Sequence, residues 1–446
     1  MTGKVSSGVE GGGEPVVIRS YDLAREPAGL DGIRALLPQA AASDLVTRDA
    51  VAAIIADVAR RGDAAVMEYN RRFDASDLAP ADWEISPATC AAALDRIPPA
   101  LREALHFAAD RIRRYHTLQI DPGFEVREAD GTVLGMRVTP LDAVGLYVPG
   151  GKAAYPSSVL MNAIPAVVAG VGEIVAVTPP GGVNDAVLAA LALSGVTRVF
   201  RIGGAQAIAA LAFGTDTVPR VDKIVGPGNR WVAEAKRQLF GQVGIDMIAG
   251  PTEVLILADD TADADDIAAD MVAQAEHDED AGAWLATTSP ELAHAVPAAL
   301  ERALAKAPRA TIARAALAQQ GLIILVPDRA HLIAIANLRA SEHLEIVTRD
   351  AEELSRGVRH AGAIFLGHST PEPVGDYVAG PSHVLPTGGT ARYASPLGVY
   401  DFVKRTSVVE YSADALDAAA PHIVALAEAE GLFGHAESVR RRMRSR

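Results

Sequence analysis

Residues 142–213, DAVGLYVPGGKAAYPSSVLMNAIPAVVAGVGEIVAVTPPGGVNDAVLAALALSGVTRVFRIGGAQAIAALAF, decide the fold class. The stretch contains three short apolar runs, at residues 144–148, 174–177 and 199–202, and an Ala-rich amphipathic segment follows each run. Strands that are apolar throughout and alternate with helices are typical of parallel βαβ units, because helices cover both faces of such a sheet. The stretch therefore predicts a parallel sheet.

The same alternation continues toward the C-terminus. A further apolar run at 223–225 precedes a helix predicted over 230–240. A second series of apolar runs predicts strands at residues 254–257, 283–286, 322–326, 344–347 and 363–366. Two α/β domains, one after the other, are the simplest account of this order. A chain of 446 residues is long enough for about three domains at roughly 150 residues each.

The segments on either side differ in texture. Apolar residues recur at helical spacing over 30–69, and residues 102–116 predict a further helix. The predicted fold class is α/β, with two Rossmann-like but incomplete parallel-sheet domains, a helical N-terminal segment and a small C-terminal appendage. The predicted borders are a disordered tail at 1–16, a helical segment at 17–141 that contributes to the first α/β domain, α/β domains at 142–250 and 251–385, and an appendage at 386–446.

Composition excludes several classes of protein. The 41 Lys and Arg against 56 Asp and Glu give a net charge of −15, which argues against nucleic acid and anionic membranes as partners. Cys90 is the single cysteine, so this chain alone forms no disulfide and no cysteine-ligated metal site. The N-terminus lacks the apolar core of a secretory signal, and no apolar stretch is long enough to span a bilayer. We therefore expect a cytoplasmic protein.

Glycine turns follow several predicted strands, and they favour a ligand cleft in the first α/β domain. The nearest match to the dinucleotide fingerprint, at 226–231, has Trp231 where the third glycine belongs, so the standard motif is absent. In open α/β sheets ligands bind beyond the carboxyl ends of strands, where glycine lets the backbone approach closely. Tyr147, Gln206 and Asn229 stand beside these turns. The alternative is that the turns are only tight connections.

Histidines, carboxylates and amides recur in the second half of the chain in settings that suit a site. Gln274 and His277 share one helix face, and Glu342 and His343 are adjacent at a helix-to-strand junction. Others lie in Gly-rich segments: Asp376, His383, Glu430 and His435. Such a set suits zinc or manganese, because it lacks soft ligands. Each group also has an ordinary interpretation, as a solvated helix end, a surface pair, a turn or a helix stop.

Together these residues resemble the histidinol dehydrogenase family, the zinc enzymes that end histidine biosynthesis. The resemblance extends from about residue 20 to about residue 440, with the blocks in the family's order. It rests on six blocks: Val225–Asn229, Ile245–Glu253, Gln274–His277, Ser341–His343, Gly375–Tyr377 with His383–Thr387, and Glu430–His435.

The resemblance implies a role for each candidate residue. Glu342 and His343 match the acid–base pair of the family. The implied ligands of one zinc ion per subunit are Gln274, His277, Asp376 and His435, with His435 supplied by the partner subunit of a homodimer. These four, the acid–base pair, Thr252, His383 and Glu430 match the positions that contact the substrate. The implied NAD contacts are Tyr147, Gln206 and Asn229.

The implied reaction is the oxidation of L-histidinol through L-histidinal to L-histidine, with two NAD consumed in sequence. The resemblance also assigns NAD to the domain at 142–250, zinc and substrate to the domain at 251–385, and exchange between subunits to the appendage. This sequence departs from the common pattern at Thr252, where serine is usual, and at Ser382, where asparagine often precedes the equivalent histidine. Thr252 keeps the hydroxyl group that the serine would supply.

Two other classes of protein remain as alternatives. A solute-binding protein would also use two α/β domains with a cleft between them, but it would need an export signal and would not need the Glu342–His343 pair. A zinc hydrolase would use the same ligand types. The absence of H-E-x-x-H and the presence of the glycine turns weigh against it.

Overall fold

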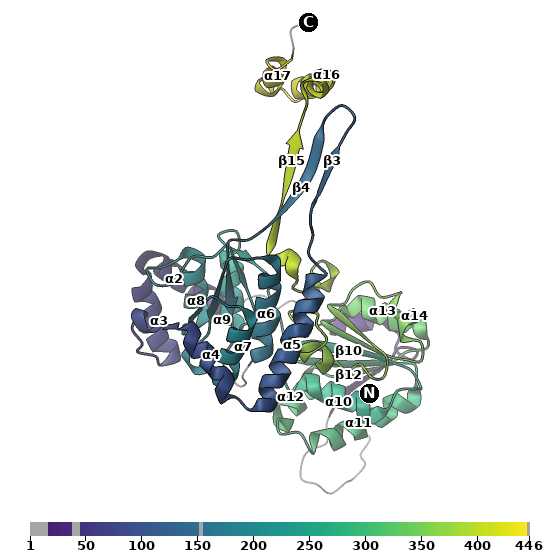
Figure 1. The fold of residues 1–446 in the computed structure, drawn as a ribbon. Helices are drawn as coiled ribbons and strands as arrows, with labels where there is room; N and C mark the ends of the chain where they lie inside the picture. The colour runs from purple at the N-terminus through teal and green to yellow at the C-terminus, as the bar shows by residue number, and fades with distance from the viewer. Residues whose placement is uncertain (1–16, 38–44, 151–154, 444–446) are drawn as a thin grey trace.

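The computed structural model describes residues 17–37, 45–150 and 155–443. The predicted tail at 1–16 lies outside the described residues. The described chain forms two six-stranded sheets covered by helices, and a slender arm that projects from them (Figure 1). This arrangement confirms the predicted α/β class with two parallel-sheet units and a C-terminal appendage.

The first sheet has the order β2-β7-β6-β5-β8-β9, and all its neighbouring strands are parallel except the edge strand β2. Alternate residues of β5 enter different cores, because successive side chains of a strand point to opposite faces. Val144 and Leu146 pack with one set of helices, and Tyr147 with the other. The strands are β2 (Glu84–Ile85), β5 (Ala143–Tyr147), β6 (Glu173–Val177), β7 (Arg198–Phe200), β8 (Lys223–Val225) and β9 (Gly244–Ile245). One face carries α4 (Pro87–Arg96), α5 (Pro99–Thr117), α6 (Pro156–Ala169) and α7 (Asp185–Ser194), and the other α2 (Leu45–Arg61), α3 (Asp63–Asp74), α8 (Gly204–Phe213) and α9 (Arg230–Leu239).

The second sheet is parallel throughout, in the order β1-β12-β11-β10-β13-β14. Its central strands are fully buried, which accounts for their continuous apolar sequences. The strands are β1 (Arg19–Asp22), β10 (Glu253–Ala258), β11 (Gly282–Thr287), β12 (Leu322–Leu325), β13 (His343–Val347) and β14 (Ala363–Leu366). One face carries α10 (Ala264–Ala275), α11 (Pro290–Leu304) and α12 (Ala310–Gln320), and the other α1 (Gly29–Leu36), α13 (Arg329–Arg339) and α14 (Ala351–Ser355).

The N-terminal segment is divided among three parts of the molecule, which corrects the expectation that residues 17–141 are helical and join the first domain. Strand β1 pairs with β12 of the second sheet, and Ile33 of α1 packs into the core of that sheet. Residues 124–140 form two strands of the arm. The periodicity of a short strand does not reveal its partner, so pairing over 300 residues of sequence was outside what the pattern could predict.

The arm consists of a three-stranded antiparallel sheet, β15-β4-β3, that ends in two helices. Every residue of β3 and β15 is exposed or half-buried. The fully buried residues of the two helices are all alanines, while Leu426 and Phe433 are exposed. The arm thus has no apolar core of its own. Its elements are β3 (Phe124–Arg127), β4 (Val133–Pro140), β15 (Val403–Glu410), α16 (Ala413–Ala429) and α17 (Phe433–Arg440).

A short connection joins opposite edges of the two sheets. Strand β9 ends at Ile245 at the carboxyl edge of the first sheet, and β10 begins at Glu253 at the amino edge of the second. Eight Cα steps of at most about 3.6 Å limit the separation of these strand ends to roughly 29 Å. Ser382 adds a direct link, because its hydroxyl donates a 3.3 Å hydrogen bond to the carbonyl of Met161 on α6.

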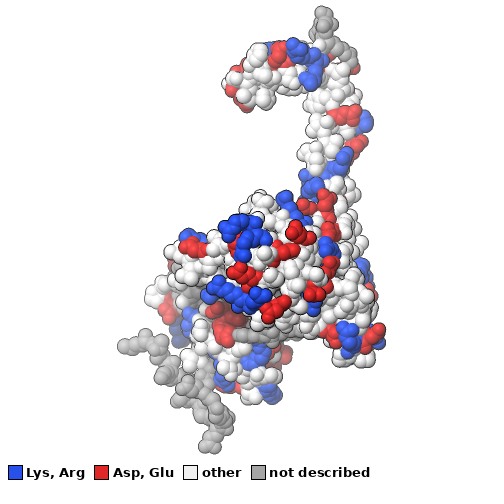
Figure 2. All heavy atoms as spheres, turned by 90° about the vertical axis from the view of Figure 1, so that its left-hand side faces the viewer, with Lys and Arg blue, Asp and Glu red and all other residues white. Residues whose placement is uncertain are grey.

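One face of the body shows no large patch of a single charge among the described residues. Acidic and basic side chains are interspersed over the face of the body that carries α2 and α3 (Figure 2). Among the described helices, none is both long enough and apolar enough to cross a membrane. Short elements complete the fold: α15 (Glu372–Tyr377) and the 3-10 turns η1 (Pro80–Asp82), η2 (Pro180–Gly182), η3 (Thr390–Arg392) and η4 (Val399–Asp401).

Candidate active site

The first residues of two neighbouring strands form the centre of the candidate site. Strands β10 and β13 are adjacent and parallel, with Val254 opposite His343. Thr252 immediately precedes β10, and Glu342 immediately precedes β13. Both residues therefore lie at the amino edge of the second sheet. This edge is opposite to the one where open α/β sheets usually bind ligands.

Glu342 is held by the start of β10. Its Oε2 accepts hydrogen bonds from the Thr252 hydroxyl at 2.6 Å and from the Glu253 amide at 2.9 Å. The pKa of Glu342 is raised to about 8, mainly by burial and also by the charges of Glu253 and Asp376, although both hydrogen bonds favour the ionised form. Glu342 therefore has a pKa near neutral pH, which is the pH range where a general base operates.

His343 is enclosed by carboxylates but is kept neutral. Its Nδ1 lies 3.7 Å from Glu342 Oε2, and its Nε2 lies 3.8 Å from both Glu372 Oε1 and Asp376 Oδ1. Neither ring nitrogen has a hydrogen-bond partner among the described residues. Burial lowers the pKa of His343 to about 4, which outweighs the attraction of Asp376. A neutral imidazole with unused nitrogens can accept a proton from a bound molecule.

A cluster of metal-ligand types adjoins His343. Ligand atoms of His277, Glu372 and Asp376 all lie within 4.8 Å of one another. Glu372 and Asp376 are four residues apart on α15, so both face the same side of the helix. The pKa of Glu372 is well above its usual range because the carboxyl is buried and close to Asp376. These three side chains, which we call the ligand cluster, offer hard nitrogen and oxygen donors.

Gln274 has an oriented amide beside this cluster. Its Nε2 donates a 2.9 Å hydrogen bond to the Thr252 hydroxyl, which in turn donates to Glu342. The opposite atom, Oε1, is buried and has no hydrogen-bond partner among the described residues. Because a buried polar atom without a partner costs free energy, this oxygen is a candidate ligand for a cation.

The segment after α15 also contributes a histidine to the site. The His383 Nδ1 lies 3.8 Å from Asp376 Oδ1, and burial lowers the pKa of this histidine. Glu253 anchors the segment, because its Oε1 accepts a 3.1 Å hydrogen bond from the Gly388 amide while its Oε2 pairs with buried Arg339 at 2.7 Å. The Ser382 hydroxyl also accepts a hydrogen bond from the Val384 amide at 3.2 Å.

The predicted cofactor positions lie at the carboxyl edge of the first sheet. Strand β5 is flanked by β6 and β8, which is the point where the strand order reverses and where such sheets bind ligands. Tyr147 ends β5, and its hydroxyl accepts a 3.1 Å hydrogen bond from the Gly204 amide. Gln206 is buried and donates to Asn70 at 3.1 Å. Asn229 is exposed, and its Oδ1 caps α9.

Two predicted residues do not join the site within one chain. Glu430 follows the last residue of α16, and His435 lies on α17. Both are exposed on the arm, which Figure 1 shows extending away from the two sheets. The chain by itself therefore assembles Thr252, Gln274, His277, Glu342, His343, Asp376 and His383, and leaves Glu430 and His435 apart.

Glu372 belongs to the assembled site although no motif in the sequence singled it out. It begins α15, between Pro371 and Pro373, and reads as an ordinary acidic residue in the first turn of a helix. Its spacing of four from Asp376 was the available signal, because residues i and i+4 share a helix face.

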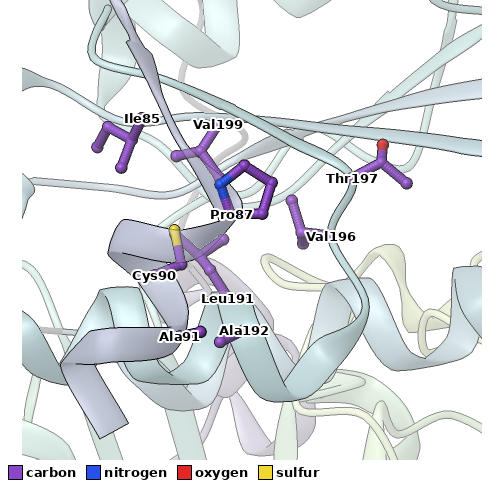
Figure 3. A pocket seen from close by; sticks show the side chains of 9 residues that line it. All are labelled: Ile85, Pro87, Cys90, Ala91, Leu191, Ala192, Val196, Thr197 and Val199. Carbon is purple, nitrogen blue, oxygen red and sulfur yellow. The ribbon is translucent and has the colours of Figure 1, made fainter. Parts of the chain in front are cut away.

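An apolar recess elsewhere carries none of these groups. It has a volume of about 130 Å³ and lies between α4, α7 and the end of the first sheet (Figure 3). Cys90 contributes to its wall, and burial raises the pKa of the thiol. The recess is thus lined by packing residues and not by chemistry-bearing ones.

Comparison with known proteins gives this geometry a context. The profile of the histidinol dehydrogenase family matches residues 38–443. The chain is 53% identical over 438 residues to histidinol dehydrogenase of Burkholderia lata, covering 96% of this chain and 99% of the relative. The chain belongs to the histidinol dehydrogenase family.

Other members of the histidinol dehydrogenase family agree in length and fold. The protein of Aromatoleum aromaticum is 53% identical over 432 residues, covering 96% of this chain and 98% of its own. The crystal structure of histidinol dehydrogenase from Elizabethkingia anophelis superposes with a TM-score of 0.89 at 34% identity, covering 95% of this chain and 98% of that one. The likeness to the histidinol dehydrogenase family thus includes the arm as well as both sheets.

Proposed function

We propose that this chain oxidises L-histidinol through L-histidinal to L-histidine, with NAD as the hydride acceptor and one zinc ion per subunit. The observation that carries the proposal is the Glu342–His343 pair set against the ligand cluster, in a chain about half identical to proteins named histidinol dehydrogenase. Its substrate is thus a small molecule, and we place the reaction in the cytoplasm, where a biosynthetic dehydrogenase draws on NAD.

The donor set fits zinc. Imidazole nitrogen and carboxylate oxygen are common zinc ligands, and an amide oxygen is a donor of similar hardness. Gln274 Oε1 has no hydrogen-bond partner among the described residues, so it is available as a ligand. We propose Gln274, His277 and Asp376 as ligands from one chain and His435 from its partner, with Glu372 as a further carboxylate in reach. When bound, zinc would act as a Lewis acid that holds the substrate's imidazole and amine.

His343 acts as the base in the first oxidation. Its ring is neutral at operating pH because its pKa is about 4. Its Nε2 faces Asp376 and Glu372, so we assign removal of the substrate hydroxyl proton to this atom. Asp376 and the Glu372 carboxyl group are placed to stabilise the imidazolium, and a bound nicotinamide would supply the hydride acceptor.

Glu342 acts in the second oxidation. We propose that its carboxylate removes a proton from water as the water adds to the aldehyde, which gives the hydrate that is oxidised next. The Thr252 hydroxyl and the Glu253 amide hold the carboxylate at Oε2, which leaves Oε1 as the atom that takes the proton. Thr252, His383 and Glu430 of the partner subunit complete the contacts to the substrate.

The first sheet supplies the NAD site in this proposal. Tyr147, Gln206 and Asn229 stand at its strand-order reversal, and the short link between β9 and β10 supports a substrate site nearby. Residues 142–250 then form the NAD side, and residues 251–385 form the metal and substrate side.

A homodimer accounts for the arm. An isolated three-stranded sheet with both faces exposed needs a partner for its apolar residues, and so do Leu426 and Phe433 at its tip. We propose that the arm, within residues 386–446 together with β3 and β4, packs on a second copy and brings Glu430 and His435 into that copy's site.

The test is a count of NADH formed per histidinol consumed. The purified protein is mixed with L-histidinol and NAD, with and without a chelator, and absorbance is followed at the NADH band. Two NADH per histidinol, lost with the chelator and restored by zinc, is the expected result. No NADH with any added metal would reject the proposal, and binding of histidinol without turnover would then favour a solute-binding protein.

A further inference from the structure

A buried ion pair for which the proposed chemistry has no role lies beside the first sheet. Lys236 of α9 and Asp246, which follows β9, pair with side chains only 4% and 1% exposed. Burying two charges costs free energy that their attraction often fails to recover, so apolar residues in their place are often equally stable. The stability of the fold alone therefore gives little reason for this pair.

Both charges hold the same glycine. Asp246 Oδ2 accepts a 2.8 Å hydrogen bond from the Gly226 amide, and Lys236 Nζ donates a 3.0 Å hydrogen bond to the Gly226 carbonyl. These two contacts fix the peptide planes on either side of Gly226. The ion pair thus restrains the backbone at one point, where β8 ends and the turn begins.

The backbone at Gly226 is closely restricted in conformation. Gly226 has φ +107°, a region that residues with a side chain rarely adopt. A Cβ at this position would lie 2.4 Å from the carbonyl oxygen of Tyr147, so the turn passes directly over the end of β5. Asn229 ends the turn and caps α9, and Pro227 and Gly228 between them are half-buried. The turn therefore begins against Tyr147 and ends at Asn229, and both residues are predicted NAD contacts.

We infer that the Lys236–Asp246 pair is a positioning pair, which shapes the turn at 226–229 to receive the dinucleotide. This inference rests on the proposed function, because it takes NAD as the ligand of the turn. The pair acts through Gly226 and touches no ligand itself. Its loss should weaken dinucleotide binding and leave the metal and substrate side unchanged.

The experiment compares two double variants with the parent enzyme loaded with zinc. Lys236→Met with Asp246→Leu removes both contacts to Gly226. Lys236→Met with Asp246→Asn also removes both charges, but it keeps an oxygen that can accept from the Gly226 amide. NADH fluorescence gives the dissociation constant, and zinc content, the affinity for histidinol and kcat at saturating NAD are measured alongside.

We expect the first variant to raise the NADH dissociation constant and the KM for NAD by about tenfold or more, as for the loss of two oriented hydrogen bonds. The second variant should lie between it and the parent. Zinc content and histidinol affinity should match the parent, and kcat should fall by less than about threefold. Should the first variant fail to fold, the second still decides, because it should weaken NADH binding measurably.

A second ion pair, at the end of β8 that is remote from Gly226, is the control. Lys223, at the other end of β8, pairs with Asp401 at 3.2 Å and also donates to the Asp401 carbonyl. Lys223→Met with Asp401→Asn removes these charges away from the turn and should leave NADH affinity unchanged. Equal NADH affinity in the parent and the Lys236/Asp246 variants, or an equal loss in the control, would overturn the inference alone. A parent enzyme that binds no NADH would reject the proposed function and this inference with it.

Discussion

Thr252 Oγ1 lies 2.6 Å from Glu342 Oε2 and donates a hydrogen bond to it, while it accepts one from Gln274. One hydroxyl group thereby orders a candidate acid–base residue and a candidate metal ligand. Because the hydroxyl has a single proton, its donation to Glu342 requires that the Gln274 amide present its NH₂ group here and turn Oε1 away. The threonine at this position keeps the hydroxyl group that the more usual serine would supply.

Loss of this hydroxyl should impair catalysis far more than its exchange for serine. Thr252→Val keeps the shape but removes the donor to a carboxylate, a contact worth about 1.5–3 kcal/mol, so kcat/KM for histidinol should fall roughly tenfold to a hundredfold. Thr252→Ser should stay within about threefold of the parent, because the hydroxyl remains. Steady-state kinetics of both variants test this, and equal activity of the valine variant would show that the hydroxyl has no role.

Activity should rise with pH as Glu342 becomes ionised. Its pKa is about 8, and only the carboxylate can take a proton from water, so the rate with L-histidinal should increase as pH rises through that value. His343, with a pKa of about 4, remains neutral over the same range. A pH profile from 5 to 10 tests this. A limb centred near 6.5 would instead point to an ordinary histidine as the titrating group.

The same group should make stability depend on pH. The folded-state pKa of Glu342 is above its ordinary value, so the buried carboxyl is neutral at low pH. The stability that this neutral form contributes to the fold is lost as pH rises through about 8. In metal-free protein, Glu342→Gln should raise the unfolding temperature at pH 9 by several degrees and change it little below pH 5. Thermal unfolding at the two pH values measures this. A constant difference would mean that ionisation of Glu342 does not contribute.

Metal content should separate the two kinds of residue in the site. His277→Asn and Asp376→Asn should lose zinc, because they remove ligands, whereas His343→Asn should retain zinc and lose turnover by at least about a hundredfold. Zinc per subunit and kcat are measured for each variant. Glu372→Gln shows whether that carboxylate is also a ligand. Equal loss of zinc in the His277 and His343 variants would contradict the division of roles.

Complementation should reveal whether the arm completes a partner's site. His343→Asn and His435→Asn are inactive separately in our proposal. Co-expressed, they form a mixed dimer in which one body with His343 meets one arm with His435, so about a quarter of the parental activity should return if chains pair at random. Mixing two copies of the His343 variant with different tags serves as the control. No recovery would place His435 in the site of its own chain, or outside any site.

The sequence predicted those parts of the site whose residues are close together in the chain. Glu342 and His343 are neighbours at the start of a strand, and Gln274 and His277 share a helix end, so their spacing already placed each pair together. The apolar runs likewise predicted most strands of both sheets. Which strand starts meet at one edge depends on the sheet order, which places β10 beside β13 although about ninety residues separate them.

The features that were missed depend on contacts between distant segments. Lys236 reads as an exposed helix residue and Asp246 as a turn residue, and only the fold brings them to Gly226. Strand β1 has four residues and a mixed sequence, which carries no information about its partner β12. Glu430 and His435 illustrate a further limit, because their place in a site depends on a second chain.

The pairing of β10 with β13 has a consequence for the biogenesis of the enzyme. Side chains of a strand alternate between the two faces of the sheet. A slip of one residue would therefore turn His343 to the opposite face and move Glu342 away from Thr252. Thr252 would then no longer be held by Glu342, and the Gln274 amide that it orients, a proposed zinc ligand, would lose its position. Since metal binding is coupled to folding free energy, zinc would be retained preferentially by correctly registered chains, and metallation would act as a proofreading step on the sheet.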